Sequence, residues 1–157
     1  MVLVELHSLS TMIELYPRYA ETDQMGIVYH ANYLIWFHEA RDAMLAALEF
    51  DIRAAETRGF RFPVVESRCR HHAPAHYGEA MQVSAVPVLD SEQNTNIARL
   101  RVRYRVRAAH GNRLVAEGET VSVVTDRNNR ILLRFPDWFE PFVGRLSKAA
   151  EIRSRKS

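Results

Sequence analysis

Residues 18–33 have the sequence RYAETDQMGIVYHANY, and residues 34–50 continue directly as LIWFHEARDAMLAALEF. The first part places an acid, Asp23, shortly before a glycine, a histidine and an asparagine. The second part is a long run in which apolar residues return at regular intervals. These two parts together indicate a polar loop that leads into a buried helix, and they raise the question of what an aspartate could do there.

The helix is indicated by apolar residues that recur at spacings of three and four, while the charged residues fall between them. We expect it to span about residues 31–48, with Asn32 as its N-cap. Residues 51–60, DIRAAETRGF, predict a short second helix that Gly59 ends. The buried face of the long helix should be formed by Tyr33, Trp36, Phe37, Ala40, Met44, Ala47 and Leu48.

After Gly59 the apolar residues alternate with polar ones, which is typical of β-strands. A single long helix followed by closely spaced strands excludes a doubly wound sheet, which requires helices between its strands. We therefore expect an α+β fold in which an antiparallel sheet of about five strands wraps around one helix. The predicted strands lie within residues 12–19, 62–74, 80–90, 96–110 and 113–126.

Arginine occupies every second position from Arg99 to Arg107, so one face of that strand is apolar and the other carries five arginines. A three-residue loop at 110–112 would place Arg105 opposite Glu117 and Arg103 opposite Glu119, which cancels charge repulsion between the strands. The small residues Ala116 and Gly118 would then lie on the opposite face, where the helix can approach closely. The arginine face is expected to be exposed or to contact another subunit, with phosphate binding as the alternative.

The composition places limits on the protein class. A chain of 157 residues fits one domain, residues 1–157, and 47% hydrophobic with 25% charged residues is ordinary for a globular protein. One cysteine, Cys69, cannot form an internal disulfide, and the N-terminal residues lack a signal-peptide pattern, so we expect a cytoplasmic location. No long uncharged stretch predicts a membrane span, and a net charge of +2 gives no support for a nucleic-acid partner.

Common catalytic and metal-binding motifs are absent from the sequence, including the serine-hydrolase, Walker and HExxH patterns. On a strand, His71 would point away from His72 and His76, so we predict no metal site. Cys69 has no neighbouring cation or helix N-terminus that would lower its thiol pKa, and a small buried residue is the expected role.

Asp23 has neighbours that suggest chemistry. An aspartate before a glycine commonly forms an Asx turn, which is the purely structural explanation. However, Tyr19 and His30 lie close in sequence, and Gly26 permits close approach of a ligand to the backbone. The helix that follows offers unpaired N–H groups and the positive end of its dipole, which could hold an oxyanion.

The pattern D-x-x-G-x-V-x-x-x-x-Y, formed by Asp23, Gly26, Val28 and Tyr33, resembles the signature of the 4-hydroxybenzoyl-CoA thioesterase family. It is most similar to the branch that contains the Tol-Pal-associated acyl-CoA thioesterases. Residues 64–79 and 114–124 resemble the family's second strand and last hairpin strand. The similarity runs over a core of about residues 12–126, which leaves a C-terminal aromatic segment and basic tail at 135–157 that should fray at its end.

This resemblance implies the hotdog fold and a homo-oligomer, a dimer or commonly a homotetramer, with sites at subunit interfaces. The implied activity is that of an acyl-CoA thioester hydrolase without a cofactor, acting on a small to medium acyl-CoA. By position, Asp23 would be the catalytic carboxylate, the His30 backbone N–H would polarise the carbonyl, and Tyr19 and the His30 side chain would be the accompanying polar pair. The implied substrate-binding residues are Gly26, Ile27, Val28 and Tyr33.

Several alternatives stay open from the sequence. Asp23 could attack the thioester or activate a water molecule. The CoA phosphates could meet Arg61, Arg68 or Arg70, or the basic residues of the tail. The rival functions are a hotdog enoyl-CoA hydratase and a non-catalytic module that binds an acyl carrier, a lipid or a nucleic acid. The basic tail residues are Lys148, Arg153, Arg155 and Lys156.

Overall fold

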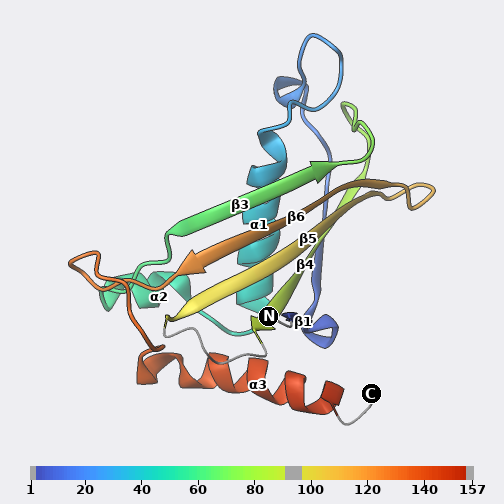
Figure 1. Cartoon of the computed structure of the whole chain (residues 1–157). Coiled ribbons are helices and arrows are strands. Elements are labelled where there is room, and N and C mark those ends of the chain that lie inside the picture. Colours follow the sequence, from blue (N-terminus) through green and yellow to red (C-terminus); the bar gives the residue numbers. More distant parts are fainter. Residues whose placement is uncertain (1–2, 91–96, 155–157) are drawn as a thin grey trace.

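The structure is a computed structural model, and it describes residues 3–90 and 97–154. A six-stranded antiparallel sheet has the order β1-β4-β5-β6-β3, and β2 also pairs with β4 (Figure 1). The strands are β1 (Leu3–Glu5), β2 (Thr11–Leu15), β3 (Val64–His71), β4 (Met81–Asp90), β5 (Arg99–Ala108) and β6 (Leu114–Val123). The helices are α1 (Asn32–Ala47), α2 (Ile52–Thr57) and α3 (Glu140–Ser154), with short 3-10 turns η1 (His7–Leu9), η2 (Tyr19–Glu21) and η3 (Asp137–Phe139).

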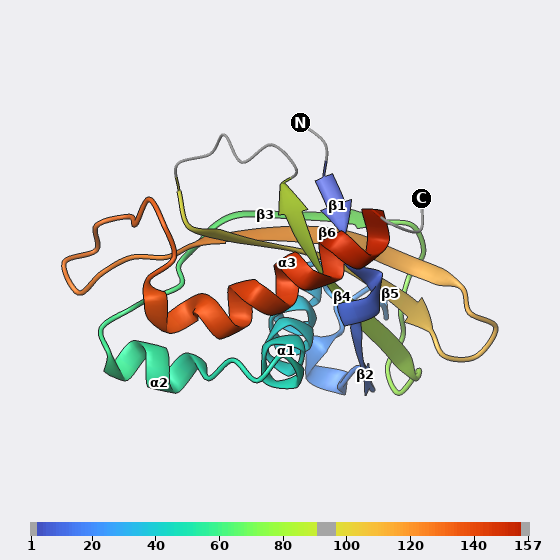
Figure 2. The same ribbon diagram turned by 90° about the horizontal axis from the view of Figure 1, so that it is seen from below.

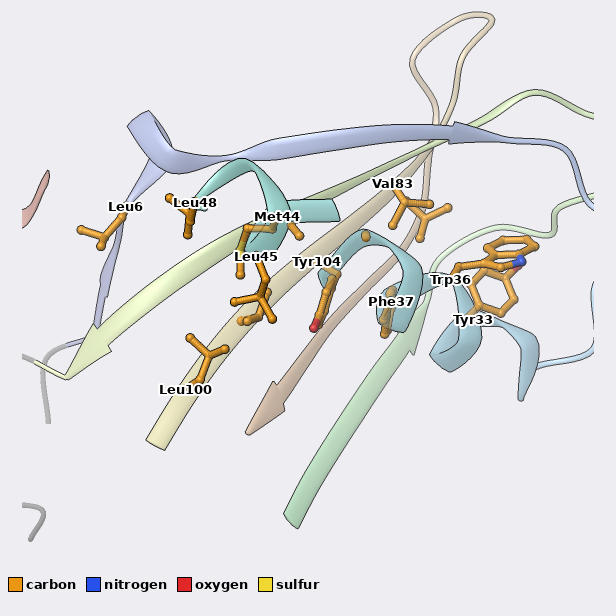
Figure 3. Packing of buried hydrophobic residues seen from close by; sticks show 14 of the residues in the cluster. Leu6, Tyr33, Trp36, Phe37, Met44, Leu45, Leu48, Val83, Leu100 and Tyr104 are labelled. Atoms are coloured by element: carbon orange, nitrogen blue, oxygen red, sulfur yellow. The ribbon is translucent and has the colours of Figure 1, made fainter. Parts of the chain in front are cut away.

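The long helix α1 lies across one face of the sheet, as the apolar spacing predicted. Its side chains Trp36, Phe37 and Met44 are fully or almost fully buried against the inner residues of the strands (Figure 3). The bounds of α1 agree with the expected range to within one residue at each end. The N-cap prediction was wrong, because Ala31 occupies that position and Asn32 is already helical.

The predicted register of the β5–β6 hairpin is confirmed, since Arg103 faces Glu119 and Arg105 faces Glu117. The turn differs from the expected one. It spans residues 109–112 and is closed by a hydrogen bond of 2.9 Å from the Ala108 N–H to the Arg113 carbonyl. A register shift between Val106 and Arg107 offsets the extra turn residue and restores the expected pairing.

Gly118 allows a close approach between α1 and the sheet. A Cβ atom at this position would lie 2.2 Å from Cε2 of Phe37, so no larger residue fits without movement. Phe37 in turn stacks on Tyr104 with ring centroids 4.5 Å apart. Burial raises the pKa of Tyr104 to about 12, and its hydroxyl hydrogen-bonds Thr120 at 2.7 Å. The small residue predicted at this face is therefore required by the helix packing.

The sequence prediction missed two elements, β1 and α3. Strand β1 pairs with β4 beside the five expected strands. Residues 140–154, which were expected to belong to an aromatic segment and a basic tail, form α3. This helix lies below α1 at the end of the sheet (Figure 1), and Figure 2 views the molecule from that side. The end of the tail, residues 155–157, lies outside the described residues. The buried α3 residues Phe142, Leu146 and Ala149 extend the core beyond residue 126. The aromatic segment before it packs Phe139 against Phe50, Phe60 and Phe62.

Replacement of Gly118 by alanine should lower the free energy of unfolding by about 1–3 kcal/mol, because the new methyl group forces Phe37 out of its stacked position. Urea unfolding followed by circular dichroism measures this. Gly144→Ala is the matched control, since nothing lies within 4 Å of the added atom in α3, and this change should leave stability equal or up to about 1 kcal/mol higher. Equal stability of Gly118→Ala and wild type would contradict the close packing.

Candidate functional site

A tight loop between η2 and α1 carries the predicted acid. Thr22 and Val28 form an antiparallel bridge, and the Asp23 N–H donates to the Ile27 carbonyl at 2.9 Å. Gly26 turns the chain with φ of +73°, a conformation that glycine adopts readily. Its N–H donates to the Asp23 carbonyl at 3.0 Å. The loop thus has a defined conformation made by its own backbone.

The Asp23 side chain forms the Asx turn that its sequence context suggested. Its Oδ1 accepts a hydrogen bond of 2.8 Å from the Met25 N–H. Within the described residues, the structure records no partner for Oδ2. The side chain is half-buried. Asp23 is therefore held in place by one oxygen and presents the other to a ligand or a water molecule.

Glu21 was overlooked in the sequence, and it is the residue that anchors the loop. It is only 6% exposed, and its carboxylate accepts hydrogen bonds from the Arg18 N–H at 2.7 Å and from Nε1 of Trp36 at 3.2 Å. Burial raises the pKa of this carboxyl, but the hydrogen bonds from Arg18 and Trp36 and the Arg18 charge together outweigh it, so the pKa is lowered. Glu21 is therefore a buried, ionised carboxylate.

The main chain of Glu21 also fixes the start of α1. Its carbonyl accepts hydrogen bonds of 2.8 Å from the Tyr29 N–H and from Nδ2 of Asn32. This contact explains why Asn32 does not cap the helix: its amide is used to join the helix to the preceding loop. In the described residues, no hydrogen bond is recorded from the backbone N–H of His30, two residues before the first residue of α1.

The predicted substrate-binding residues are divided between the surface and the core. Val28 and Tyr33 are buried, and the Val28 N–H donates to the Ala75 carbonyl at 2.9 Å. Gly26 is exposed and Ile27 is half-buried on the outer side of the loop. Tyr33 packs its ring against Trp36 at 4.8 Å, so it supports the loop from beneath.

Tyr19, Asp23 and His30 share this part of the surface, but no hydrogen bond or ion pair joins their side chains in the described residues. Tyr19 is 78% exposed and packs edge-on against Tyr77 at 5.9 Å. His30 is exposed and packs against Tyr29 at 4.3 Å. In a single chain, these three side chains therefore line an open surface.

His71, at the end of β3, lies next to this surface and was not predicted to belong to it. Its ring packs edge-on against Tyr33 at 4.7 Å. Burial lowers the pKa of His71, and the nearby His30 and His72 lower it further. Only the pairing of distant strands brings His71 close to His30, which is why local sequence gave no signal.

The other candidate residues have structural partners. The arginines of β5 form ion pairs across the sheet: Arg103 contacts Glu5 at 2.7 Å and Glu119 at 3.0 Å, and Arg105 contacts Glu117 at 3.3 Å. These pairs offset much of the positive charge of the arginine face. Burial raises the pKa of the half-buried Cys69 to about 11, which agrees with a packing role. Across residues 3–90 and 97–154, no three histidine, cysteine or acidic side chains come together as metal ligands.

The cations considered for CoA phosphates are spread over the molecule. Arg68 pairs with Glu66 at 2.7 Å, and Arg61 donates to Oδ1 of Asn129 at 3.0 Å. Lys148 and Arg153 belong to α3, at the end of the sheet. Arg155 and Lys156 lie outside the described residues. The described members of this set therefore do not form one cluster beside Asp23.

The sequence from residue 17 to residue 143 matches the family described as "Thioesterase-like superfamily". The chain belongs to this superfamily. A solved structure of a DHNA-CoA thioesterase from Staphylococcus aureus superimposes with a TM-score of 0.76, at 26% identity over 94% of this chain and 95% of that one. The α+β arrangement of the thioesterase-like chain is thus the hotdog fold, as predicted.

Two sequence relatives of this thioesterase-like chain match it over different lengths and at different identities. "Putative acyl-CoA thioesterase YneP" of Bacillus subtilis is 49% identical over 70 residues, which cover 45% of this chain and 51% of that protein. A 1,4-dihydroxy-2-naphthoyl-CoA hydrolase of Thermosynechococcus vestitus is 30% identical over 76% of this chain and 78% of its own. The described residues contain no helix that is long and apolar enough to cross a bilayer.

Replacement of Glu21 by glutamine should lower the free energy of unfolding at pH 7 by about 1–3 kcal/mol. The Arg18 and Trp36 N–H groups donate to different oxygens of the carboxylate, and an amide has only one oxygen. Since the folded-state pKa of Glu21 is lowered, its contribution is present above the unfolded-state pKa of about 4.3 and is lost as the pH falls further.

Urea titrations of wild type and Glu21→Gln at pH 7 and near pH 3 test this, and the difference between the two proteins should shrink at the lower pH. Glu56→Gln, an exposed change on α2, is the control and should have no effect at pH 7. A difference of the same size at both pH values would show that ionisation of Glu21 is not the cause.

Proposed function

We propose that this chain is an acyl-CoA thioesterase that hydrolyses a small to medium acyl-CoA to the free acid and CoA. The observation that carries the proposal is Asp23, whose Oδ1 is held by the Met25 N–H. Among residues 3–90 and 97–154, neither its Oδ2 nor the backbone N–H of His30, just before α1, has a hydrogen-bond partner. Support comes from the names of the Bacillus and Thermosynechococcus relatives.

The chemistry follows from these two groups. The His30 N–H and the positive end of the α1 dipole would stabilise the negative charge that develops on the thioester oxygen, which is worth about 3 kcal/mol for one well-placed donor. The Asp23 carboxylate would either attack the carbonyl carbon, forming an anhydride that water opens, or take a proton from the attacking water. In both routes the C–S bond breaks and CoA leaves as its thiolate, which needs little assistance.

The branch that contains the Tol-Pal-associated acyl-CoA thioesterases is our finer assignment, and it rests on Tyr19 and His30 beside Asp23. In this assignment Tyr19 and the His30 side chain position substrate or water, while Gly26, Ile27, Val28 and Tyr33 form the wall next to the carbonyl. An enoyl-CoA hydratase would add water to a double bond without releasing a thiol, so an assay with an enoyl-CoA distinguishes it from a thioesterase. A nucleic-acid binding module would need free arginines on β5, and those of its centre are paired.

We further propose a cytoplasmic homo-oligomer built from dimers, with a homotetramer as the full assembly. In the part of the chain that the structure describes, strand β3 is at the edge of the sheet and pairs only with β6, so its outer N–H and C=O groups can pair with another strand. Val64 and Val65 on this strand are exposed, as are several large apolar residues around the start of α1. These are Tyr19, Met25, Tyr29, Leu34, Ile35 and Tyr77.

Asp23→Asn should reduce kcat for thioester hydrolysis by at least about a hundredfold, since the amide is neither a nucleophile nor a base. Thiol release from acetyl-, hexanoyl-, dodecanoyl- and benzoyl-CoA measures this. Asp137→Asn, at the distant start of η3, is the matched control and should retain full turnover. His30→Ala should cost less than Asp23→Asn, because the backbone N–H remains. Near-normal turnover of Asp23→Asn would refute the proposed role.

Introducing charge on the β3 edge should separate the subunits. The double change Val64→Asp and Val65→Asp replaces two exposed apolar side chains of the edge by carboxylates, and charged side chains on an edge strand oppose the addition of another strand. Light scattering after size exclusion should show a dimer or larger species for wild type and a monomer for the variant, with loss of thioesterase activity. A wild-type monomer with full turnover would contradict the proposed assembly.

A further inference from the structure

The β3–β4 loop, residues 72–80, packs against both ends of the loop that carries the proposed acid. At one end, the Gly78 N–H donates to the Pro17 carbonyl at 2.9 Å. At the other end, the Val28 N–H donates to the carbonyl of the fully buried Ala75, also at 2.9 Å. The β3–β4 loop therefore supports the candidate site from a distant part of the sequence.

The contact at Val28 bears on the proposed oxyanion donor, the backbone N–H of His30. The two residues before His30 both donate their own N–H groups to fixed acceptors. Val28 donates to the Ala75 carbonyl, and Tyr29 donates to the Glu21 carbonyl at 2.8 Å. The direction of the His30 N–H is thus set from two sides. Since such a donor must lie within hydrogen-bond distance of the developing oxyanion, a small shift in its position lowers the rate.

Arg113, the residue before β6, holds the β3–β4 loop in shape. Its Nη1 donates to the Pro74 carbonyl at 2.9 Å, and its Nη2 donates to Oε1 of Glu79 at 2.7 Å. The other oxygen of Glu79 accepts the His76 N–H at 3.2 Å. The planar fork of one guanidinium therefore joins two points of the loop that lie on either side of Ala75.

The backbone of Arg113 is itself fixed by the β5–β6 hairpin, because its carbonyl accepts the Ala108 N–H that closes the turn. The side chains of Arg113 and Glu79 are 41% and 29% exposed. An ion pair this accessible to water adds little to folding stability. These contacts therefore fix the shape of one loop and contribute little to the stability of the whole chain.

We infer that Arg113 is a positioning residue for the His30 N–H in the thioesterase reaction. Its contacts with Pro74 and Glu79 hold the β3–β4 loop. The Ala75 carbonyl of that loop then holds the backbone that leads to His30. Arg113 does not touch the substrate in this role, and it acts on the transition state through the oxyanion donor, so it governs kcat more than KM. The inference rests on the proposed thioesterase function.

Arg113→Gln should lower kcat by at least about tenfold and change KM by less than about threefold, because the oxyanion donor loses its fixed direction. Thiol release from the best of the four acyl-CoAs measures both constants. Arg107→Gln is the matched control and should keep kcat within about twofold. Arg107 donates to the Asn112 carbonyl of the same hairpin at 2.9 Å, and among the described residues it has no recorded hydrogen bond or ion pair with the β3–β4 loop.

Two further variants make the test independent of a single substitution. Arg113→Lys should recover part of the lost kcat, because one ammonium group reaches either the Pro74 carbonyl or Glu79 but cannot fork to both. Glu79→Gln should lower kcat less than Arg113→Gln does, because the contact with Pro74 remains. If Arg113→Gln fails to fold by circular dichroism, these two variants carry the test.

Hydrogen exchange followed by NMR gives a readout that does not depend on activity. Since the Val28 N–H is bonded to the Ala75 carbonyl, it should exchange at least about tenfold faster in Arg113→Gln than in wild type. Arg107→Gln should leave this exchange rate unchanged. Amides of β4 and β5 should exchange equally in all three proteins, which shows that the fold is intact.

The outcomes identify which idea fails. No turnover by the wild type on any of the four acyl-CoAs would remove the proposed function and this inference with it. Turnover by the wild type, with equal kcat for Arg113→Gln and Arg107→Gln, would overturn only the positioning role. A loss of kcat that merely follows the unfolded fraction in urea, with unchanged exchange at Val28, would overturn it as well.

Discussion

The buried carboxylate of Glu21 joins three parts of the molecule that would otherwise be independent. Its oxygens accept from the Arg18 backbone and from Trp36 in the core, and its carbonyl holds the residues that begin α1. A charge in this position is stable only while these donors remain, since an unpaired buried carboxylate is costly. The Asp23 loop therefore cannot shift without disturbing the helix and the core together. This rigidity suits a site that depends on a fixed backbone N–H.

Much of the fold followed from the sequence because its signals are local. The spacing of apolar residues gave α1, the alternation gave five strands, and the charges on β5 and β6 gave their register. Strand β1 has three residues and depends on pairing with β4, which no local pattern reveals. Helix α3 was missed because its basic composition suggested a tail. Its apolar residues Phe142, Leu146 and Ala149 are spaced by four and three, so the signal was present.

The candidate site was only partly predictable for a related reason. Asp23, Gly26 and His30 are close in sequence, and the loop that holds them is stabilised by its own backbone. Glu21 gave no signal, because a glutamate three residues from an arginine usually forms a surface ion pair, and here Trp36 covers it. His71 lies beside this loop only because of the order in which the strands pair, so the residues next to it in the sequence gave no signal.

The space that Gly118 leaves for Phe37 also bears on how the strands find their alignment. A shift of one residue between β5 and β6 would turn every arginine towards the core, which the alternation of faces forbids. A shift of two residues keeps the faces and would still set two arginines opposite Glu117 and Glu119. It would, however, replace Gly118 beneath Phe37 by Ala116 or Thr120, and neither leaves room for the ring. Gly118 therefore selects the register of the two strands. Charge pairing alone permits several registers that differ by two residues, and only the one with Gly118 beneath Phe37 leaves room for the ring.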